Sequence, residues 1–300
     1  MKAMDNNLSG EVSRWQEKLF KRSVRRQTRL RKIKQLLSAV SNQHCLEICA
    51  GDGVISEQLH LDGGIWTTLV PDADAQDSMG YFVKSNVQVL QNETIDAPDG
   101  SFDVVVIIDA LERMRDDRAF IKECHRVLKP DGRLIISVAR KMVFCLGACP
   151  LRAILGQSWR RRGLARSGYT SSEFFDVLKD GFDVPETVSY STCCVEAPGL
   201  LCEAAANKLA GGPYNMPPAD ADTQHFYHYT KLVALGALAY PLMWIFSKLE
   251  GALLFILPGH NLVAKTKRRV WRERRTPILM DGRSIAEAAL NTKIGTAAPF

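Results

Sequence analysis

The sequence predicts an α/β protein with a doubly wound, mostly parallel sheet, and two patterns carry that prediction. Short β-type runs alternate with helical stretches of about ten residues or more, which implies right-handed βαβ crossovers. The run 103–108, DVVVII, is nearly all apolar, as expected of a central parallel strand covered on both faces. In chain order the predicted strands are 44–49, 65–70, 87–90, 103–108, 133–138, 187–195 and 261–267.

A helix is predicted over 116–129, where apolar residues such as Phe120 and Cys124 recur at helical spacing. The turn residues Pro130–Asp131–Gly132 are expected to end it, and His125 is expected on its surface. Further helices are expected after Gly53 and over 169–179.

The chain divides into four predicted parts. Basic residues crowd the stretch from Arg14 to Lys34, where apolar residues recur at spacings of three and four, the pattern of an amphipathic helix. This helix either packs on the domain with a solvated basic face or contacts nucleic acid or an anionic membrane. The predicted parts are an N-terminal basic helix (1–40), an α/β core (41–196), a helical apolar insertion (197–258), and a last strand with a disordered tail (259–300).

The apolar insertion contains a run without charge, 232–246. A helix of that length spans about 22 Å, short of the hydrocarbon core of about 30 Å, and Pro241 interrupts it. Three alternatives remain for 231–258: a buried packing helix, a cover over a substrate cavity, or an interfacial element that contacts lipid. Tyr240 and Trp244 fit a pocket wall or a membrane interface.

The eight cysteines are scattered and none forms a CxxC motif, so no metal site is predicted, not even at Cys145 and Cys149. No apolar core of a signal peptide follows the first residues. The expected location is the cytoplasm, with reduced thiols.

The stretch 45–59, CLEICAGDGVISEQL, is the most informative motif. A strand carrying the acidic Glu47 leads through a glycine-containing turn into a helix, and such glycines let the backbone approach a ligand closely. The dinucleotide fingerprint G-x-G-x-x-G fails, because Cys49 and Ser56 stand at its outer positions. A ligand other than a dinucleotide is therefore expected at the carboxyl ends of the strands.

Together with two later segments, this motif resembles the class I S-adenosyl-L-methionine (SAM)-dependent methyltransferases, in particular the small-molecule group that includes quinone and sterol methyltransferases. The family pattern LEIGCGxG, F-D-x-V, L-E-H, R-V-L-K-P-G-G appears in 40–140 as LEICAGDG, FDVV, LER and RVLKPDG. The departures are Cys49 at the usual first glycine with Ala50 after it, Arg113 at the usual histidine, and Asp131 at a usual glycine. The resemblance implies a Rossmann-like fold, SAM as cofactor, and methyl transfer to a small, hydrophobic or lipid-like acceptor.

The resemblance also implies roles for single residues. Direct attack on the methyl group needs no enzyme nucleophile, only proximity and alignment, and a base only where the acceptor must lose a proton. The candidate bases are Tyr169, His125 and His225. The family pattern places Glu47, Cys49, Ala50, Gly51, Asp52 and Gly53 at the amino-acid end of SAM, with Glu47 orienting the turn or contacting the ammonium, Asp72 (or Asp74) at the ribose, Gln91 or Asn92 at the adenine, and Asp109 and Ala110 at the methionine and its methyl group.

Other functions stay open. Cys49 and Ala50 in the turn allow a catalytically degenerate methyltransferase-fold module that only binds, and the basic helix with the apolar insertion allows a membrane-surface scaffold. Without a recognisable nucleic-acid module, a nucleic-acid substrate is disfavoured. The oligomeric state, the base and the acceptor are left open.

Overall fold

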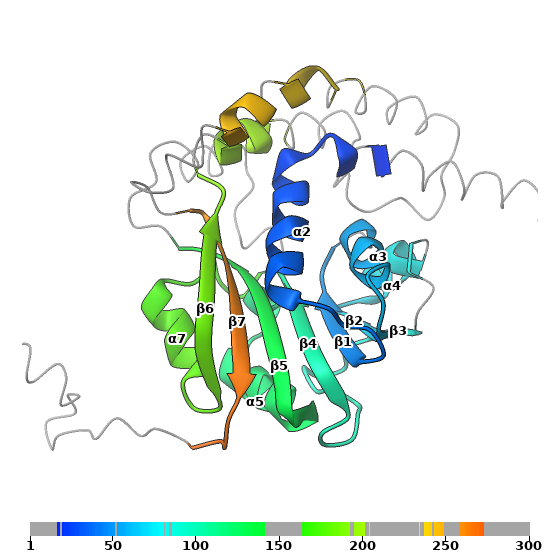
Figure 1. Cartoon of the computed structure of the whole chain (residues 1–300), viewed down its shortest axis with the longest axis vertical. Helices are drawn as coiled ribbons and strands as arrows, with labels where there is room; N and C mark the ends of the chain where they lie inside the picture. The colour runs from blue at the N-terminus through cyan, green and yellow to red at the C-terminus, as the bar shows by residue number, and fades with distance from the viewer. Residues whose placement is uncertain are drawn as a thin grey trace, which may run out of the picture.

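The computed structural model describes residues 17–18, 20–51, 53–80, 82–83, 86–141, 164–192, 195–201, 204, 234, 237–241, 243–248 and 259–272. They form a seven-stranded sheet in the order β3-β2-β1-β4-β5-β7-β6, flanked by helices (Figure 1). Strands β1 to β5 are parallel, and β7 runs antiparallel between β5 and β6. The predicted doubly wound, mostly parallel sheet is confirmed. The strands are β1 His44–Cys49, β2 Ile65–Val70, β3 Asn86–Val89, β4 Phe102–Ile108, β5 Leu128–Ala139, β6 Phe182–Tyr190 and β7 Asn261–Arg268.

Two helical layers enclose the sheet. The central strand β4 is covered on both faces, which explains its apolar sequence. Val104 and Val106 belong to the core on the side of α2, α3 and α4, whereas Val105 and Ile107 belong to the core on the side of α5 and α7. Because successive strand residues face opposite sides, both faces require apolar residues. The helices are α2 Val24–Leu37, α3 Val54–His60, α4 Ala73–Gly80, the 3-10 turn η1 Leu111–Arg113, α5 Asp117–Val127 and α7 Ser171–Leu178.

The predicted N-terminal basic helix is interrupted at Arg22 and Ser23, and its second part is α2, which packs on the domain. The Ser23 side chain accepts a hydrogen bond from the Arg26 backbone N–H and caps the helix. Ile33 and Leu36 are buried in the core on the α3 and α4 side, while Arg31 remains exposed. The apolar side of α2 therefore packs on the domain, and residues 1–16 lie outside the described part of the chain.

Two predicted boundaries are wrong. The helix predicted over 116–129 ends at Val127, and β5 begins at Leu128, so Pro130–Asp131–Gly132 lies inside that strand. An irregularity in the β4–β5 register between Phe102 and Val104 accommodates this segment.

The sixth strand was predicted at 187–195 but runs over Phe182–Tyr190. Its ladder with β7 determines these bounds, and its register shifts between Asp183 and Glu186, where Pro185 cannot donate a hydrogen bond. Val195 belongs instead to the helical residues 195–201.

The carboxyl ends of the parallel strands meet at the upper edge of the sheet in Figure 1. There the start of α2 meets the helical residues 195–201 and a helical piece of the predicted insertion, since Val24, Val195 and Met243 form one buried apolar cluster. The rest of the insertion and the predicted tail after residue 272 lie outside the described residues. Among the helices that the structure describes, none has the length and apolar character required to cross a membrane.

Candidate functional site

The glycine-containing turn after β1 has the geometry of a close backbone approach. Gly53 adopts φ +83°, and a Cβ at this position would lie 3.0 Å from the Met79 sulfur and 3.2 Å from the Phe82 Cβ. A side chain is therefore excluded twice, by conformation and by packing. Gly51 is exposed at the turn, and Asp52 lies outside the described residues.

Cys49, the departure from the usual first glycine, does not obstruct the turn. Its side chain is buried in the apolar core on the α3 side, and its sulfur accepts a hydrogen bond from the Gly51 N–H at 3.3 Å. Burial, with the nearby Glu47 carboxylate, raises the pKa of this thiol, so it remains protonated and inert. Ala50 is partly buried against the opposite core.

Glu47 is completely buried and connects β1 to α3. The Ser56 hydroxyl donates to its Oε1 at 2.6 Å, and the His60 Nε2 lies 2.9 Å from its Oε2. The His60 ring in turn stacks on Trp66 at 4.7 Å. Both carboxylate oxygens are thus engaged by α3, which suits the predicted role of orienting the turn.

Asp72 follows β2 and is exposed at the carboxyl edge. Its Oδ1 accepts a hydrogen bond from the Ala75 N–H at 2.8 Å and so caps the first turn of α4. The cap positions the carboxylate at the end of the second strand, where the ribose contact is predicted. The side chain of Asp74 lies outside the described part of the structure.

A cavity of about 480 Å³ opens beside the ends of β2 and β3. Asn92, one of the two predicted adenine contacts, lines it at φ +51°, whereas Gln91 is exposed and its carbonyl closes a tight turn with Thr94. The cavity has the volume of a small-molecule site. Its lining consists of Pro71, Leu90, Asn92, Glu93, Arg113, Met114 and Arg115.

The tip of β4 carries an ion pair that reaches it from another part of the chain. Asp109 stands at φ +51° and its carboxylate pairs with Arg29 of α2. Burial alone would lower the pKa of Arg29, but Asp109 and the Tyr190 hydroxyl outweigh it and raise that pKa, so the guanidinium stays charged. Ala110 is fully buried and packs in the core on the α5 side.

Glu112, one turn further, is a buried carboxyl group. Its Oε1 accepts a hydrogen bond from the Ala139 N–H at 2.5 Å, and its Oε2 has no hydrogen-bond partner in the structure described. Burial and the charge of Asp109 raise the pKa of Glu112 to about 7. Its protonation therefore changes near neutral pH.

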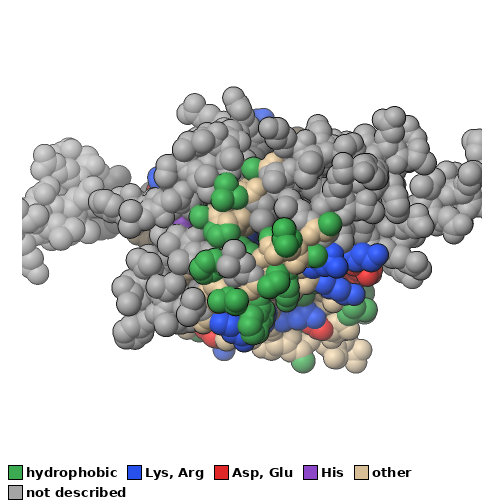
Figure 2. All heavy atoms as spheres, turned by 90° about the horizontal axis from the view of Figure 1, so that it is seen from above, with side chains coloured by type: hydrophobic (Ala, Val, Ile, Leu, Met, Phe, Trp, Pro, Cys, Tyr) green, Lys and Arg blue, Asp and Glu red, His purple; other side chains and the backbone are tan. Residues whose placement is uncertain are grey.

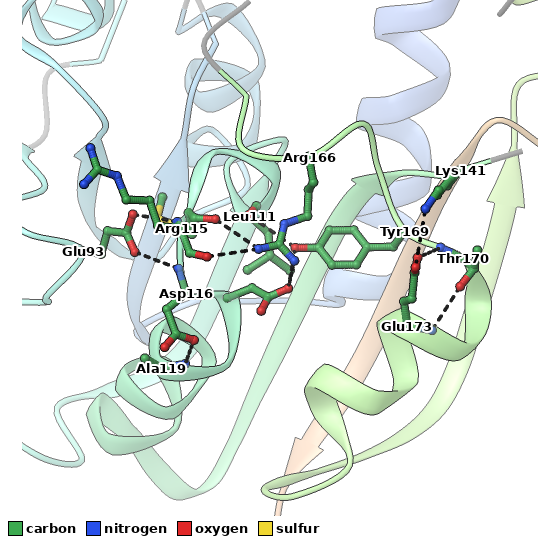
Figure 3. A network of polar contacts seen from close by, with 12 residues as sticks. Glu93, Leu111, Arg115, Asp116, Ala119, Lys141, Arg166, Tyr169, Thr170 and Glu173 are labelled. Atoms are coloured by element: carbon green, nitrogen blue, oxygen red, sulfur yellow. Dashed lines mark hydrogen bonds and ion pairs between the residues drawn. The ribbon is translucent and has the colours of Figure 1, made fainter. Parts of the chain in front are cut away.

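Figure 3 shows how the segment before α7 is held over η1 and α5. The Tyr169 hydroxyl lies 3.1 Å from Asp117 Oδ2 and 3.4 Å from the Leu111 carbonyl oxygen, and Arg166 pairs with the same carboxylate. Burial and Asp117 raise the pKa of Tyr169. A phenol held in this way is a structural clamp and a poor general base at neutral pH.

His125 is also removed from the candidate bases, and its predicted surface position is wrong. It is buried where β5 begins, with Nε2 2.7 Å from the Arg269 carbonyl and its ring edge-on to Phe182 and Trp271. His225 lies outside the described residues. Within the part of the chain that the structure describes, no three His, Cys, Asp or Glu side chains gather as a metal site.

Comparison of the sequence with known proteins identifies a family to which this part of the chain is similar. A family model described as a methyltransferase domain matches residues 46–136, which hold the glycine turn, β4 and most of β1 and β5. Residues 46–136 are a class I SAM-dependent methyltransferase domain.

Relatives of the methyltransferase domain include the ubiquinone biosynthesis O-methyltransferase of Pseudomonas aeruginosa, which is 26% identical over 110 residues. The match covers 35% of this chain and 47% of the relative, so the chain spans about half the length of the curated relatives it matches.

Solved structures share the fold at low identity. An S-adenosylmethionine-dependent methyltransferase from Mesorhizobium loti has a TM-score of 0.50 at 14% identity, covering 79% of this chain and 96% of that one. The cyclase SpnF has a TM-score of 0.52 at 15% identity, covering 82% of each chain. At these identities the likeness concerns the fold alone.

The residues of the methyltransferase domain fit SAM. Gly53 gives the turn its left-handed conformation, the Asp72 carboxylate follows β2, and the cavity offers the Asn92 amide beside the apolar Leu90 and Met114, which suits an adenine ring. The motif reading missed Arg29 and Glu112. Glu112 stood in the LER motif and could have been singled out there, whereas the sequence carries no signal that pairs Arg29 with Asp109.

Proposed function

We propose that the chain transfers a methyl group from SAM to a small, hydrophobic or lipid-like acceptor. The observation that carries the proposal is the joining of three features at one edge: the side-chain-free turn at Gly53, the carboxylate of Asp72 and the cavity lined by Asn92. The names of the relatives, which refer to ubiquinone biosynthesis, support a small-molecule acceptor.

SAM supplies a methyl group on a sulfonium sulfur. An acceptor lone pair forms the new bond to carbon while the carbon–sulfur bond breaks, which leaves neutral S-adenosylhomocysteine and, for a hydroxyl acceptor, a proton to be released. The chain contributes alignment of the two reactants, which can lower the barrier by about 7–11 kcal/mol. Asp109 at the tip of β4 stands where the methionine end of SAM is proposed to lie.

Calorimetric titration of the purified chain with SAM, and separately with S-adenosylhomocysteine, tests the proposal. Binding of both is expected, and Asp72→Ala or Gly51→Val should weaken it at least about tenfold, which is about 1.4 kcal/mol. Because Asp72 also caps α4, Thr170→Ala, which removes the cap of α7, is the matched control and should bind SAM normally. A folded chain that binds neither ligand would contradict the proposal.

The Arg29–Asp109 ion pair favours a second candidate, a catalytically degenerate module that binds without methyl transfer. The pair engages the residue proposed to face the reacting methyl. Release of S-adenosylhomocysteine during an acceptor screen that begins with lipophilic phenols and quinones would exclude this candidate, while tight SAM binding without turnover of any acceptor would favour it.

We further propose a cytoplasmic location with peripheral contact to a membrane through 231–258, which would bring a lipophilic acceptor to the carboxyl edge. No nucleic-acid partner is proposed.

A further inference from the structure

We infer that the carboxyl edge of the sheet carries a docking surface for an anionic lipid bilayer. The surface consists of the helical residues 195–201, 237–241 and 243–248, together with Lys18 and Lys21 before α2. The inference deepens the proposed function, on which it rests for the lipophilic acceptor, by naming the partner and the residues that meet it.

The helical segment 243–248 is apolar on two sides, and only one of them is used for packing. Met243 is 7% exposed and packs with Val24 and Val195, and Phe246 is packed against the same cluster. On the outer side, Trp244 is 49% exposed and Ile245 is 51% exposed. A helix that only covered a core would present polar residues outward.

Neighbouring segments extend this apolar surface. Leu238 is 81% exposed and Leu201 is 51% exposed. Figure 2 looks onto this edge and shows hydrophobic side chains gathered beside Lys and Arg. Exposed apolar side chains that gather on one face are typical of an interaction site.

The charge beside the apolar side chains identifies the occupant. Lys18 and Lys21 are exposed in the helical turn before α2, and the ammonium group of Lys248 lies 5.3 Å from the Trp244 ring centre. The run 232–247 contains no Asp or Glu. An acid-free apolar and aromatic run that is flanked by lysines matches an anionic membrane interface.

The start of α2 is anchored rigidly to this surface. Arg25 pairs with the buried Glu196 at 2.9 Å, and a Cβ on Gly199 would lie 2.2 Å from the Arg25 Cδ, so residues 195–201 lie directly on α2. Since Arg29, one turn later, reaches Asp109, the docking surface and the tip of β4 share one helix. A lipophilic acceptor leaving the bilayer would enter next to the proposed methyl-transfer position.

Co-sedimentation of the full chain with vesicles tests the inference without SAM, so its result is independent of the SAM titration. Vesicles of phosphatidylcholine with about 30% phosphatidylglycerol should pellet the chain at least about tenfold more strongly than phosphatidylcholine alone, and high salt should release it. Leu238→Glu with Ile245→Glu should abolish pelleting. The matched control, Leu61→Glu with Ile65→Glu, changes exposed apolar residues where β2 begins and should pellet like wild type.

A second pair of variants tests the charge. Lys18→Glu with Lys21→Glu should weaken binding to the anionic vesicles at least about tenfold, whereas Lys267→Glu with Arg272→Glu, exposed at the opposite edge, should leave it unchanged.

Three outcomes would overturn the inference: a wild-type chain that does not pellet, equal pelleting of wild type and the Leu238/Ile245 variant, or equal binding to neutral and anionic vesicles. Light scattering that reveals an oligomer broken by the Leu238/Ile245 substitutions, without vesicle binding, would show instead that this face joins copies of the chain. A chain that binds vesicles but neither SAM nor S-adenosylhomocysteine would leave the docking surface standing and remove the proposed methyl transfer.

Discussion

The two halves of the carboxyl edge are built in different ways. On the side of β1 and β2, contacts join near neighbours in the sequence: Ser56 and His60 hold Glu47, and Ala75 is capped by Asp72. On the side of β4 and β5, contacts join distant segments, such as Arg25 with Glu196 and Arg29 with Asp109.

This difference explains why a sequence motif predicts the contacts of the first half and not those of the second. The first half is a contiguous turn between a strand and a helix, so its residue types are constrained together. The second half depends on α2 being laid across the sheet, and its charged pairs form only after the core has assembled. Substitutions in the two halves should therefore fail in different ways.

The largest effect is expected from Gly53→Val in the first half. The substitution places a branched side chain at φ +83° and within 3.0 Å of Met79. We expect the free energy of unfolding to fall by about 3–5 kcal/mol from backbone strain and overpacking, with loss of SAM binding. Urea unfolding and calorimetry measure the two effects. The control is Gly80→Ala, where an added Cβ meets nothing within 4 Å, and it should change neither stability nor SAM binding. Equal losses in the two variants would contradict the role assigned to the turn at Gly53.

Arg25→Met tests the long-range half. It removes the guanidinium that pairs with the buried Glu196 carboxylate, which keeps its hydrogen bonds from Ser191 and Asn261, and should lower the free energy of unfolding by about 2–4 kcal/mol. Lys34→Met on the same helix breaks the exposed pair with Asp62 and should cost about 0–1 kcal/mol. Urea unfolding measures the free energy of unfolding of both variants. Similar losses in the two variants would mean that the buried Arg25–Glu196 pair stabilises the fold no more than the exposed Lys34–Asp62 pair.

Glu112→Gln tests the buried carboxyl beside Asp109. Because the folded state raises the pKa of Glu112 to about 7, this group stabilises the fold below its unfolded pKa and loses that contribution as pH rises through 7. The wild-type free energy of unfolding should fall between pH 5 and pH 8, and the variant should be more stable at pH 8 by about 1–3 kcal/mol.

Glu173→Gln provides the matched control for this pH series. The Thr170 backbone N–H lowers the pKa of Glu173, so its contribution is lost only as pH falls below the usual range for glutamate. Its slope between pH 5 and pH 8 should equal that of wild type. An unchanged slope in Glu112→Gln would contradict the raised pKa.

The smallest effect is expected from Thr170→Ala. Thr170 and Glu173 form a capping box at the start of α7, with the Thr170 Oγ1 accepting from the Glu173 N–H at 3.2 Å. Its removal should lower the free energy of unfolding by about 0.5–2 kcal/mol, without an effect on SAM titration. A change in SAM affinity would show that the segment before α7 is coupled to the first half.

The sequence by itself determined the succession of strands and helices along the chain and the motif that locates the turn. Both depend on short-range patterns. DVVVII predicted the buried β4, and the run from Leu46 to Gly53 predicted the turn between β1 and α3. The helix predicted over 169–179 is likewise present as α7. Boundaries of β5 and β6 were missed, because pairing with β4 and β7 overrides the local turn residues.

Only the tertiary structure decided what surrounds the tip of β4. Arg29 meets Asp109, Glu112 is buried beside it, and Met243 packs on Val24, each across a long stretch of chain. No local pattern encodes such contacts, since burial and pairing of charges depend on which segments the folded core brings together. For the same reason the pKa of Glu112 and the exposed side of 243–248 became visible only once the sheet, α2 and the insertion were placed together.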